Sequence, residues 1–507
     1  MKSALYFFKI SILFFFIASG CTENPTLNFE LLVPENSVFF QDLTSVTVTL
    51  DDKVKVYPVE NGFLSFDAKF ASSYGNVTRL EIKGKNSSDE VTAWGRTPLF
   101  TTVESSWTLG LYFGEVNTIG QLHSEVSFPC SDTSAVKIYT GTGNTPDDIL
   151  GHFFIGGTMD GTILDTVSYY DPYFHAPYQF DPLPFGIKNT NVMVVSTSII
   201  LFYGGIFSDN TFSDKLYYYD SGCSYSCGAS ELTWGDDSPP ALAGAVVLPL
   251  GPFEDFVDDY DGRELISAFA LMGGETPDGP YENILLVTAW LDSLTQAIVI
   301  EQREIQWDNS RTDFTAQVTN RGTDEISIAV YGGENVTQLI TLNIEDNPDG
   351  ITFSANFNEI DSEFQPLNPR SIVTQDNTFI FMGGITADGT MVDKVYALNP
   401  ERMELEEMSA KLSRTDFSIA SIGDTIVAAG GICEQGLCEN AVILKVFESD
   451  TGIDVENDSV TSLQTPRINP MLYTLSTGNI AISGGTDSDD NCVKSLELYT
   501  PQPQSVN

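Results

Sequence analysis

Paired glycines recur along this chain of 507 residues, and they limit its fold more than any other feature of the sequence. The stretch FIFMGG, residues 379–384, shows the pattern, in which an apolar run ends on two glycines. The seven pairs are Gly156-Gly157, Gly204-Gly205, Gly273-Gly274, Gly332-Gly333, Gly383-Gly384, Gly430-Gly431 and Gly484-Gly485. Because glycine has no Cβ, it lets a neighbouring sheet approach closely and adopts backbone angles closed to other residues.

The first glycines of successive pairs are separated by 48, 69, 59, 51, 47 and 54 residues. Between them, short segments rich in Val, Ile, Phe and Tyr alternate with turns of Gly, Asp, Asn and Pro, which predicts four antiparallel strands per unit. A period of about 50 residues without a helical pattern is typical of a β-propeller, in which each unit forms one blade. We therefore predict an all-β fold with seven blades, or six if one unit is degenerate.

Further repeated residues accompany the glycines. Tyrosines follow several pairs, tryptophans end two units, and arginines precede several first strands. These residues are Tyr170, Tyr219, Tyr396 and Tyr499, then Trp234 and Trp307, then Arg311, Arg370, Arg414 and Arg467. The pattern resembles the kelch repeat, which implies a kelch-like β-propeller over residues 98–507. The third unit departs from the pattern by an insertion, and the fourth lacks the tyrosine.

Residues 28–97 have a different periodicity. SVTVTL, residues 45–50, alternates with Val46, Val48 and Leu50 on one face, and residues 54–70 contain the turn signal Asn61-Gly62. Six short strands in about seventy residues predict a small immunoglobulin-like β-sandwich ahead of the propeller.

The seventh unit has three predicted strands before the chain ends. Residues 107–116, WTLGLYFGEV, have a strand-like composition, and we expect them to pair beside residues 494–500, KSLELYT, and so to remove an open sheet edge. Cys130 and Cys492 lie on either side of this place. We therefore predict a disulfide between them, with two free thiols as the alternative.

The N-terminus has the features of a leader. Lys2 and Lys9 are basic, residues 10–18 are apolar, and Ala-Ser-Gly precedes Cys21. This resembles the lipobox of bacterial lipoproteins, which implies a signal peptide over residues 1–20, lipidation of Cys21 and a linker over residues 21–27. Thr22 in place of aspartate implies the outer membrane of the bacterial envelope, with a periplasmic or surface-exposed protein anchored only by lipid. An ordinary secretory leader is the alternative.

Six of the seven cysteines remain for disulfides in a chain that leaves the cytosol. Besides Cys130 and Cys492, two local pairs are expected, Cys223 with Cys227 and Cys433 with Cys438. A metal site is the alternative for the local pairs, but neither has a neighbouring histidine, and the spacing is not that of a zinc knuckle.

Acidic residues outnumber basic ones by 70 to 24, which gives a net charge of −46. Such a field repels nucleic acids and anionic lipid head groups, so neither is an expected partner.

Every loop after a glycine pair is acidic, and a propeller would bring these loops to one face, suited to cations or a basic partner. The alternative is that these acidic side chains only stabilise their own turns by accepting hydrogen bonds from nearby backbone amides. The residues are Asp160, Asp165, Asp209, Asp214, Asp278, Glu282, Glu334, Asp388, Asp393, Glu434, Glu439, Asp487, Asp489 and Asp490.

The insertion in the third unit is the densest acidic segment. Residues 251–263 read GPFEDFVDDYDGR, and Asp258, Asp259 and Asp261 are candidate calcium ligands because calcium binds several carboxylate oxygens. A solvated acidic loop is the alternative, and no other cofactor is expected.

The sequence contains three histidines and no nucleophile elbow, phosphate loop or zinc-protease helix. The kelch resemblance extends to copper radical oxidases, but this chain has too few histidines for that chemistry. We therefore expect a binding module for a protein or glycan ligand, with an extracytoplasmic enzyme acting on glycans as the alternative. Carboxylates and aromatic residues at the axial channel would favour the enzyme.

Overall fold

The computed structural model describes most of the chain. The described residues are 26–35, 37–60, 62–64, 70–71, 75–101, 108–123, 125–126, 128–140, 145–221, 228–235, 238–251, 263–292, 294–295, 297–307, 309–319, 325–347, 350–374, 376–449 and 452–503. Within these ranges the fold is all-β, with two short 3-10 helices, η1 (Phe39–Gln41) and η2 (Pro146–Asp148), and no α-helix.

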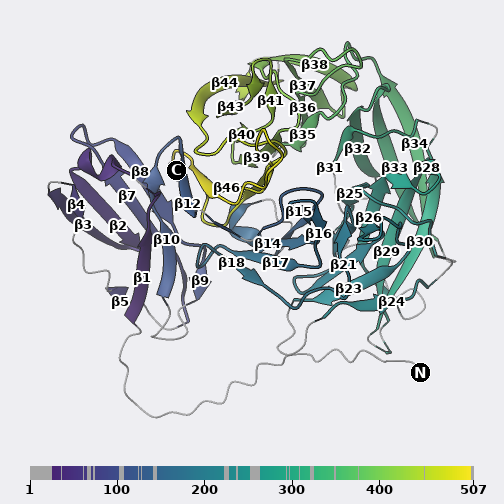
Figure 1. Cartoon of the computed structure of the whole chain (residues 1–507), viewed down its shortest axis with the longest axis horizontal. Coiled ribbons are helices and arrows are strands. Elements are labelled where there is room, and N and C mark those ends of the chain that lie inside the picture. Colours follow the sequence, from purple (N-terminus) through teal and green to yellow (C-terminus); the bar gives the residue numbers. More distant parts are fainter. Residues whose placement is uncertain are drawn as a thin grey trace.

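The first strands form two packed sheets, which stand beside a ring of further sheets (Figure 1). The smaller sheet has the order β10 (Thr108–Tyr112), β1 (Thr26–Leu32) and β5 (Phe70–Ala71). The larger sheet has the order β11 (Gly114–Glu115), β8 (Val91–Arg96), β7 (Leu80–Lys85), β2 (Ser45–Leu50), β3 (Lys53–Glu60) and β4 (Phe63–Leu64). A short pair, β6 (Val77–Thr78) with β9 (Phe100–Thr101), accompanies them.

The core of this sandwich follows from the alternation in β2. Val46, Val48 and Leu50 are fully buried, whereas the residues between them are half-exposed. They pack with Leu109 and Leu111 of β10 in one apolar cluster. Alternation with a period of two therefore places one face of each strand in the core, as the sequence predicts.

Residues 108–115 belong to the sandwich. β10 pairs in parallel with β1, with Phe29 opposite Leu109, and β11 pairs with β8, with Gly114 opposite Trp94. The sandwich therefore extends to about residue 115, beyond the predicted boundary at residue 97. The physical reason is that Leu109 and Leu111 fill the sandwich core.

Seven four-stranded antiparallel sheets follow in the described residues, here numbered in chain order. Sheet 1 is β13 (Ser134–Tyr139), β14 (Ile149–Ile155), β17 (Val167–Asp171), β18 (Ala176–Gln179), and sheet 2 is β20 (Asn191–Val194), β21 (Ile199–Tyr203), β23 (Leu216–Asp220), β24 (Ser230–Leu232). Sheet 3 is β25 (Val246–Pro249), β26 (Arg263–Met272), β29 (Asn283–Asp292), β30 (Ile298–Gln306), and sheet 4 is β31 (Phe314–Thr319), β32 (Glu325–Gly332), β33 (Thr337–Asn347), β34 (Gly350–Ile360).

The last three sheets continue this pattern. Sheet 5 is β35 (Arg370–Val373), β36 (Phe379–Met382), β37 (Lys394–Asn399), β38 (Glu404–Lys411), and sheet 6 is β39 (Ser418–Ile422), β40 (Thr425–Ala429), β43 (Asn440–Ser449), β44 (Gly452–Ser462). Sheet 7 is β45 (Met471–Thr474), β46 (Ile480–Ser483), β47 (Leu496–Thr500) and, from the other end of the chain, β12 (Thr118–His123). Figure 1 shows the sheets following one another around a ring, an arrangement consistent with a β-propeller.

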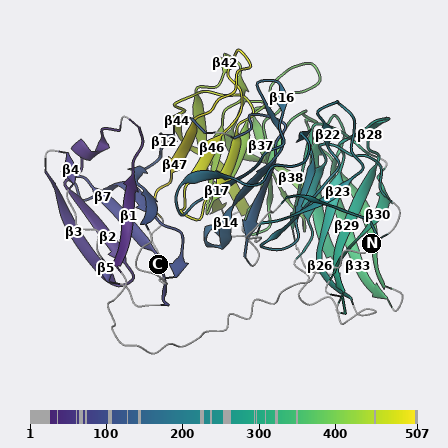
Figure 2. The ribbon, with the colours of Figure 1, turned by 60° about the horizontal axis from the view of Figure 1, so that its bottom comes forward.

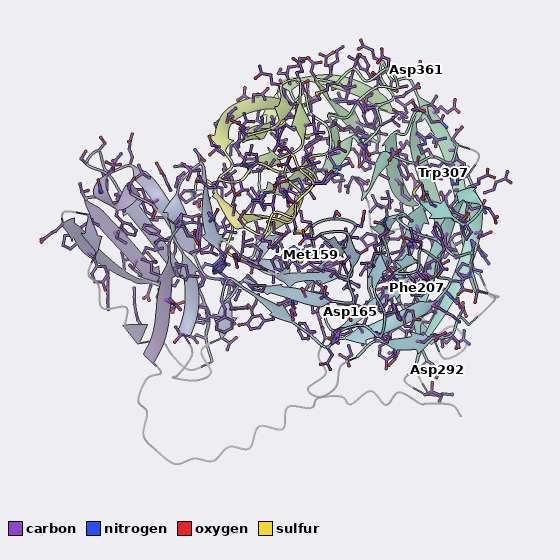
Figure 3. All side chains as sticks on the ribbon, viewed as in Figure 1. Met159, Asp165, Phe207, Asp292, Trp307 and Asp361 are labelled. Carbon is purple, nitrogen blue, oxygen red and sulfur yellow. A yellow bond between two sulfur atoms is a disulfide. The ribbon has the colours of Figure 1, made fainter. Side chains whose placement is uncertain are left out.

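Neighbouring sheets pack face to face through apolar side chains. Trp307, 1% exposed, lies in a cluster with Leu286 of sheet 3 and Val330 of sheet 4. Figure 3 shows Trp307 between these sheets, whereas Asp292 and Asp361 lie at the outer rim. The first strands of consecutive sheets contact one another from β13 to β45, so they form the inner wall of the ring.

The loops between second and third strands share one face of the ring. Figure 2 shows this for four short strands within these loops, β16 (Thr162–Ile163), β22 (Ile206–Phe207), β28 (Gly279–Pro280) and β42 (Gly436–Leu437). The second-to-third strand loops of sheets 1, 2, 3 and 6 therefore lie on one face, and the gathering of all the acidic loop residues there stays a prediction.

The fourth strand of sheet 7 differs from the prediction. β12 pairs antiparallel with β47, with Ile119 opposite Tyr499 and Gln121 opposite Glu497. Residues 107–116 were expected in this place, but their described part lies in the sandwich. The chain leaves the sandwich at β11, turns at Asn117, whose φ is +60°, and enters sheet 7 one strand later.

Candidate functional site

The paired glycines lie where each sheet meets the next. The first glycine of every pair has a positive φ, a region that disfavours residues with a Cβ. A Cβ at any of these seven positions would lie no more than 2.9 Å from a backbone carbonyl oxygen of the following unit. At Gly430, for example, it would lie 2.6 Å from the carbonyl oxygen of Arg467. The repeat therefore demands glycine because the next sheet's backbone occupies the space of a side chain.

The second glycine of the pair donates its amide to the next unit. This backbone hydrogen bond is 2.8 to 2.9 Å long at six of the seven junctions between described residues. The donors and acceptors are Gly157 to Ile187, Gly205 to Leu242, Gly333 to Pro366, Gly384 to Arg414, Gly431 to Arg467, and Gly485 to Cys130. The last of these bonds joins sheet 7 to sheet 1.

Three repeat arginines hold the glycine turns from within their own unit. The guanidinium of Arg311 donates to the carbonyl of Gly332 at 3.1 Å, and that of Arg414 to Gly430 at 3.1 Å. Arg467 does the same to Gly484 at 3.2 Å. Arg370 is different because it lies inside β35, and it donates to the carbonyl of Phe417 at 2.7 Å. Its pKa, like those of the other three, is lowered by burial.

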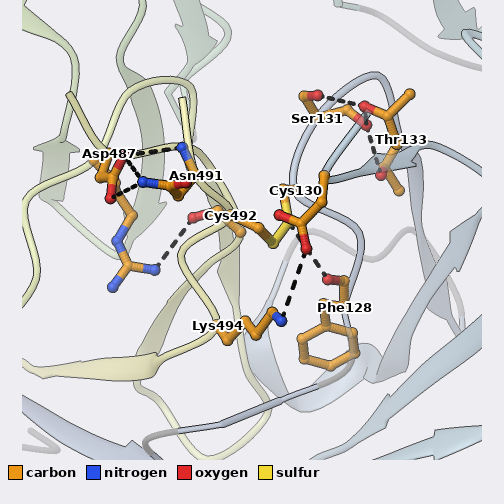
Figure 4. Close-up of a disulfide and its surroundings, with 12 residues drawn as sticks. Phe128, Cys130, Ser131, Thr133, Asp487, Asn491, Cys492 and Lys494 are labelled. Atoms are coloured by element: carbon orange, nitrogen blue, oxygen red, sulfur yellow. Dashed lines mark hydrogen bonds and ion pairs between the residues drawn. A yellow bond between two sulfur atoms is a disulfide. The ribbon is translucent and has the colours of Figure 1, made fainter. Parts of the chain in front are cut away.

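Two disulfides are present among the described cysteines. Cys130 is bonded to Cys492 across the seam, the contact between sheets 7 and 1, with a Cα to Cα distance of 5.4 Å (Figure 4). Cys433 is bonded to Cys438, also with a Cα to Cα distance of 5.4 Å. These are links that the sequence predicts, whereas Cys223 and Cys227 lie outside the described residues.

Several acidic loop residues serve their own turns. Asp209, Asp388 and Asp487 each accept a hydrogen bond from the amide two residues further on, at 3.0, 3.2 and 2.8 Å. Side-chain hydrogen bonds lower the pKa of each of these three carboxyl groups, from Thr211, Thr386 and Asn491 first. Stabilisation of their own turns thus explains why acidic residues occur at these three positions.

Other predicted sites fall outside the described residues. These are the leader with Cys21 and the candidate calcium ligands Asp258, Asp259 and Asp261. In the described ranges, no group of three or more His, Cys, Asp or Glu side chains is arranged to hold a metal ion. The same ranges contain no helix of the length and apolar character needed to cross a membrane.

A pocket of about 470 Å³ lies along the inner wall of the ring. The first strands of sheets 1, 2 and 3 provide most of its lining. The lining residues are Thr133, Ser134, Ala135, Val136, Lys137, Tyr139, Asn189, Thr190, Val192, Met193, Val194, Gly244, Ala245, Val247, Pro249 and Phe269. We call this cavity the axial pocket.

Lys137 is the one charged residue among those lining residues. Its ammonium lies 5.3 Å from the centre of the Tyr139 ring, within the range of a cation–π contact. Its charge also acts on His152, which lies opposite it on β14. Burial first, and the charge of Lys137 second, lower the pKa of His152 to about 3. The described lining of the axial pocket therefore includes one basic side chain.

None of the three histidines is among the described lining residues, and two of them, His152 and His175, lie in the core. His152 is 5% exposed and packs against the ring of Tyr473 at 4.7 Å. His175 is fully buried, its Nδ1 lies 3.0 Å from the Tyr170 hydroxyl, and burial lowers its pKa to about 3. His123 Nε2 lies 3.0 Å from the carbonyl oxygen of His175. The three histidines therefore contact residues of sheets 1 and 7 and help to pack the region around the seam.

The sequence offered no signal for the axial pocket. Lys137 and Tyr139 occur in SAVKIY, which is typical of an ordinary strand, and the other walls come from residues 189–194, 244–249 and 269. Comparison with models of known protein families finds no matching family, and comparison with curated proteins finds no matching relative.

Proposed function

We propose that this chain is an extracytoplasmic binding module, anchored in the bacterial outer membrane by lipid on Cys21. In this proposal the seven sheets are the blades of a closed, kelch-like β-propeller, and the sandwich is immunoglobulin-like. The repeated hydrogen bond from the second glycine supports the propeller, because the bond from Gly485 to Cys130 gives the seam the same geometry as the other junctions. The lipobox-like residues before Cys21 support the anchor.

The junction between sandwich and ring supports a single rigid module. Arg96 Nε donates to the carbonyl of Thr477 at 3.1 Å, and its guanidinium lies 5.6 Å from the centre of the Trp94 ring. The amide of Asn117 donates to the carbonyl of Thr500 at 2.7 Å. Because strands and side chains tie both parts together, the ring is presented in a fixed orientation to the sandwich.

The axial pocket is the observation that carries the binding function. Its lining combines apolar side chains with a few polar groups and one amine, as is usual in ligand pockets. Hydrolysis of glycans commonly requires a pair of carboxyl groups flanking the scissile bond. The described lining includes neither a carboxyl group nor a histidine, so it favours binding over the alternative of an enzyme acting on glycans.

A blocked pocket tests this function. The delipidated protein is used to capture ligands from envelope extracts and on a glycan array, beside Val247→Trp, which fills the pocket, and Val460→Trp, which changes a valine that is 61% exposed on β44. We expect the unmodified protein and V460W to retain the same ligands and V247W to lose them, with all three showing cooperative melting. Equal capture by V247W would exclude the axial pocket as the binding site.

A further inference from the structure

Four exposed apolar side chains lie where the sandwich meets the ring. They are Val77, Leu99, Phe174 and Tyr178, which are 64%, 37%, 41% and 43% exposed, and we call them the junction patch. Single exposed apolar residues are normal on a protein surface, whereas a connected group of them indicates an interaction site. The contacts around these residues therefore decide whether they form one surface.

The sandwich half of the junction patch comes from the pairing of β6 with β9. Thr78 pairs with Phe100, and both side chains are buried. Val77 and Leu99 directly precede these two residues in the chain. Because side chains alternate between the two faces of a strand, Val77 and Leu99 point away from the core. The strand pair therefore presents two aliphatic side chains to solvent.

The ring half comes from sheet 1, at the turn between β17 and β18. Phe174 lies in this turn, and its ring meets that of Tyr178 edge to face, with 6.4 Å between the ring centres. Tyr173 connects the two halves. Its hydroxyl donates to the carbonyl oxygen of Leu99 at 2.8 Å, and its own carbonyl accepts the amide of Gly110 at 2.8 Å. The junction patch therefore forms one surface across the sandwich and sheet 1.

We propose that the junction patch rests on the surface of the lipid bilayer and orients the anchored protein. This inference rests on the proposed lipid anchor at Cys21 and adds a second contact with the membrane. Tyrosine suits the boundary between lipid and water because its ring leaves water while its hydroxyl stays hydrated. Since the acyl chains already hold the protein, the patch only has to favour one orientation.

The length of the tether supports a membrane as the occupant. Cys21 lies five residues before Thr26, where β1 begins, and five residues span at most about 18 Å. Glu30, four residues further along β1, lies opposite Gly110, whose amide bonds to the turn that carries Phe174. Four residues of strand cover roughly 13 Å, and one strand spacing adds about 5 Å across the sheet. The lipid and the junction patch can therefore reach the membrane surface together.

The acidic charge of the protein selects the kind of lipid. Two carboxylates border the junction patch. Glu30 is exposed on β1 opposite Gly110, and Asp171 accepts the amide of Tyr173 at 2.7 Å. Together with the net charge of −46, they disfavour an anionic membrane surface. We therefore expect the patch to rest on zwitterionic head groups.

A tryptophan placed in the patch reports contact with lipid. Phe174→Trp and Phe357→Trp are purified with their acyl chains and reconstituted in phosphatidylcholine vesicles, with and without bromine on the lipid acyl chains as a short-range quencher. Phe357 is the matched control because it is 39% exposed on β34, across the ring from the sandwich (Figure 1). Apolar side chains at the interface lie about 5 to 10 Å deep, so we expect the fluorescence that F174W adds to fall roughly by half, and that of F357W to stay unchanged.

Dispersal of the patch tests the same contact. Leu99→Ser with Tyr178→Ser should remove most of the quenching of F174W, and vesicles of phosphatidylglycerol should also lower it. Melting curves confirm that every variant is folded. Equal quenching of F174W and F357W, quenching that the two serines leave unchanged, or equal quenching on the anionic lipid would overturn the proposal.

The delipidated chain separates the patch from the anchor. Loss of one partly buried phenylalanine should reduce co-sedimentation of Phe174→Ser with concentrated phosphatidylcholine vesicles roughly threefold, whereas Phe357→Ser should match the unmodified chain. Where mass spectrometry finds lipid on Cys21, the quenching decides, and its failure overturns the patch while the anchor stands. Where Cys21 is unmodified, the anchor is wrong and co-sedimentation decides the patch. Dimers of the delipidated chain that F174S abolishes would assign the patch to a second copy and overturn the proposal.

Discussion

The amide of Gly485 donates a 2.8 Å hydrogen bond to the carbonyl oxygen of Cys130 and so joins the last sheet to the first. The same residue, Cys130, is bonded to Cys492, and β12 supplies the fourth strand of sheet 7. The seam therefore has the same glycine hydrogen bond as the other junctions, and in addition a disulfide and a strand that comes from the N-terminal side of sheet 1. This arrangement suits the one place in the ring where adjacent sheets are not consecutive in the chain.

The disulfide across the seam should contribute strongly to stability. It joins residues 362 positions apart, and on the chain-entropy model a loop of that length stabilises by roughly 6 kcal/mol. We expect Cys130→Ser with Cys492→Ser to lower the free energy of unfolding in urea by that order. Non-reducing peptide mapping should recover the Cys130 peptide linked to the Cys492 peptide.

The local disulfide provides the control. Cys433 and Cys438 are 5 positions apart, so removal of both thiols should cost about 2 kcal/mol on the same model. A Cys130 peptide linked to another cysteine would contradict the assigned pairing. Equal losses in the two double variants would contradict the role of loop length.

The glycine junctions should be the positions most sensitive to an added methyl group. Gly430→Ala places a Cβ 2.6 Å from the carbonyl oxygen of Arg467 and imposes a φ of +71° on alanine. Gly389 has a φ of +84° but no atom within 4 Å of a Cβ, so Gly389→Ala isolates the cost of the backbone angle. That angle costs roughly 1 to 2 kcal/mol.

We expect G389A to lose an amount in that range and G430A to lose clearly more, because the carbonyl of the next sheet must also move. Urea unfolding of both variants measures the difference. Similar losses would mean that the double glycine is required for its backbone angles alone, and that the close approach of the next sheet adds nothing.

The steric requirement explains why the repeated sheets were predictable and the fourth strand of sheet 7 was not. A double glycine is needed wherever the next sheet's carbonyl occupies the side-chain position, so each junction leaves its own mark in the sequence. The fourth strand of sheet 7 leaves no such mark. TLGLY, residues 108–112, and TIGQLH, residues 118–123, are both strand-like, and tertiary packing distinguishes them: Leu109 and Leu111 are buried in the sandwich, whereas Ile119 is buried against sheets 6 and 7.

The candidate site was hidden for a related reason. Lys137, Val192 and Val247 come from three different units, and each reads as part of an ordinary inner strand. Their common cavity arises from how the sheets are arranged around the axis. By contrast, the disulfide across the seam was predictable, because the six cysteines other than Cys21 form an even set and the last unit has only three predicted strands.

A buried ion pair next to the seam should be sensitive to the loss of one partner. Arg467 and Glu497 form a salt bridge with both side chains fully buried, and Glu497 also accepts the amides of Gln464 at 2.8 Å and Thr465 at 3.0 Å. Glu497→Gln leaves the guanidinium without its counter-charge, so we expect a loss of about 3 to 5 kcal/mol in urea unfolding.

Lys445→Gln is the matched control on the surface. Its ammonium lies 2.9 Å from Asp424, but the two side chains are 30% and 53% exposed. Pairs of this kind contribute roughly 0 to 1 kcal/mol, so K445Q should be close to the unmodified protein. A loss in E497Q as small as that in K445Q would show that the buried pair adds little to the stability of sheet 7.

The anchor can be tested independently of the fold. Small residues precede Cys21 after an apolar run, so we expect the mature chain to begin at Cys21 with diacylglycerol on its sulfur and an acyl chain on its amine. Mass spectrometry of the N-terminal peptide measures this, and Cys21→Ser should release the protein from the membrane fraction. An unmodified Cys21, or cleavage at another residue, would contradict the anchor.

The buried histidines should make stability depend on pH. Burial lowers the pKa of His152 to about 3, whereas a histidine in the unfolded chain has a pKa near 6.5. Between these values the unfolded state binds a proton that the folded state does not bind. The free energy of unfolding therefore falls as the pH drops below about 6.5, by about 2 kcal/mol at pH 5 for this one residue.

Protonation of carboxylates changes stability over the same range, so the contribution of His152 is best measured as a difference. His152→Phe keeps a ring against Tyr473, which lies 4.7 Å away, but cannot bind a proton. We expect urea unfolding at pH 7 and pH 5 to show a smaller loss for H152F, by about 2 kcal/mol, because only the unmodified chain gains the proton on unfolding. Parallel losses in the two proteins would mean that His152 is protonated in the folded state, in conflict with its burial.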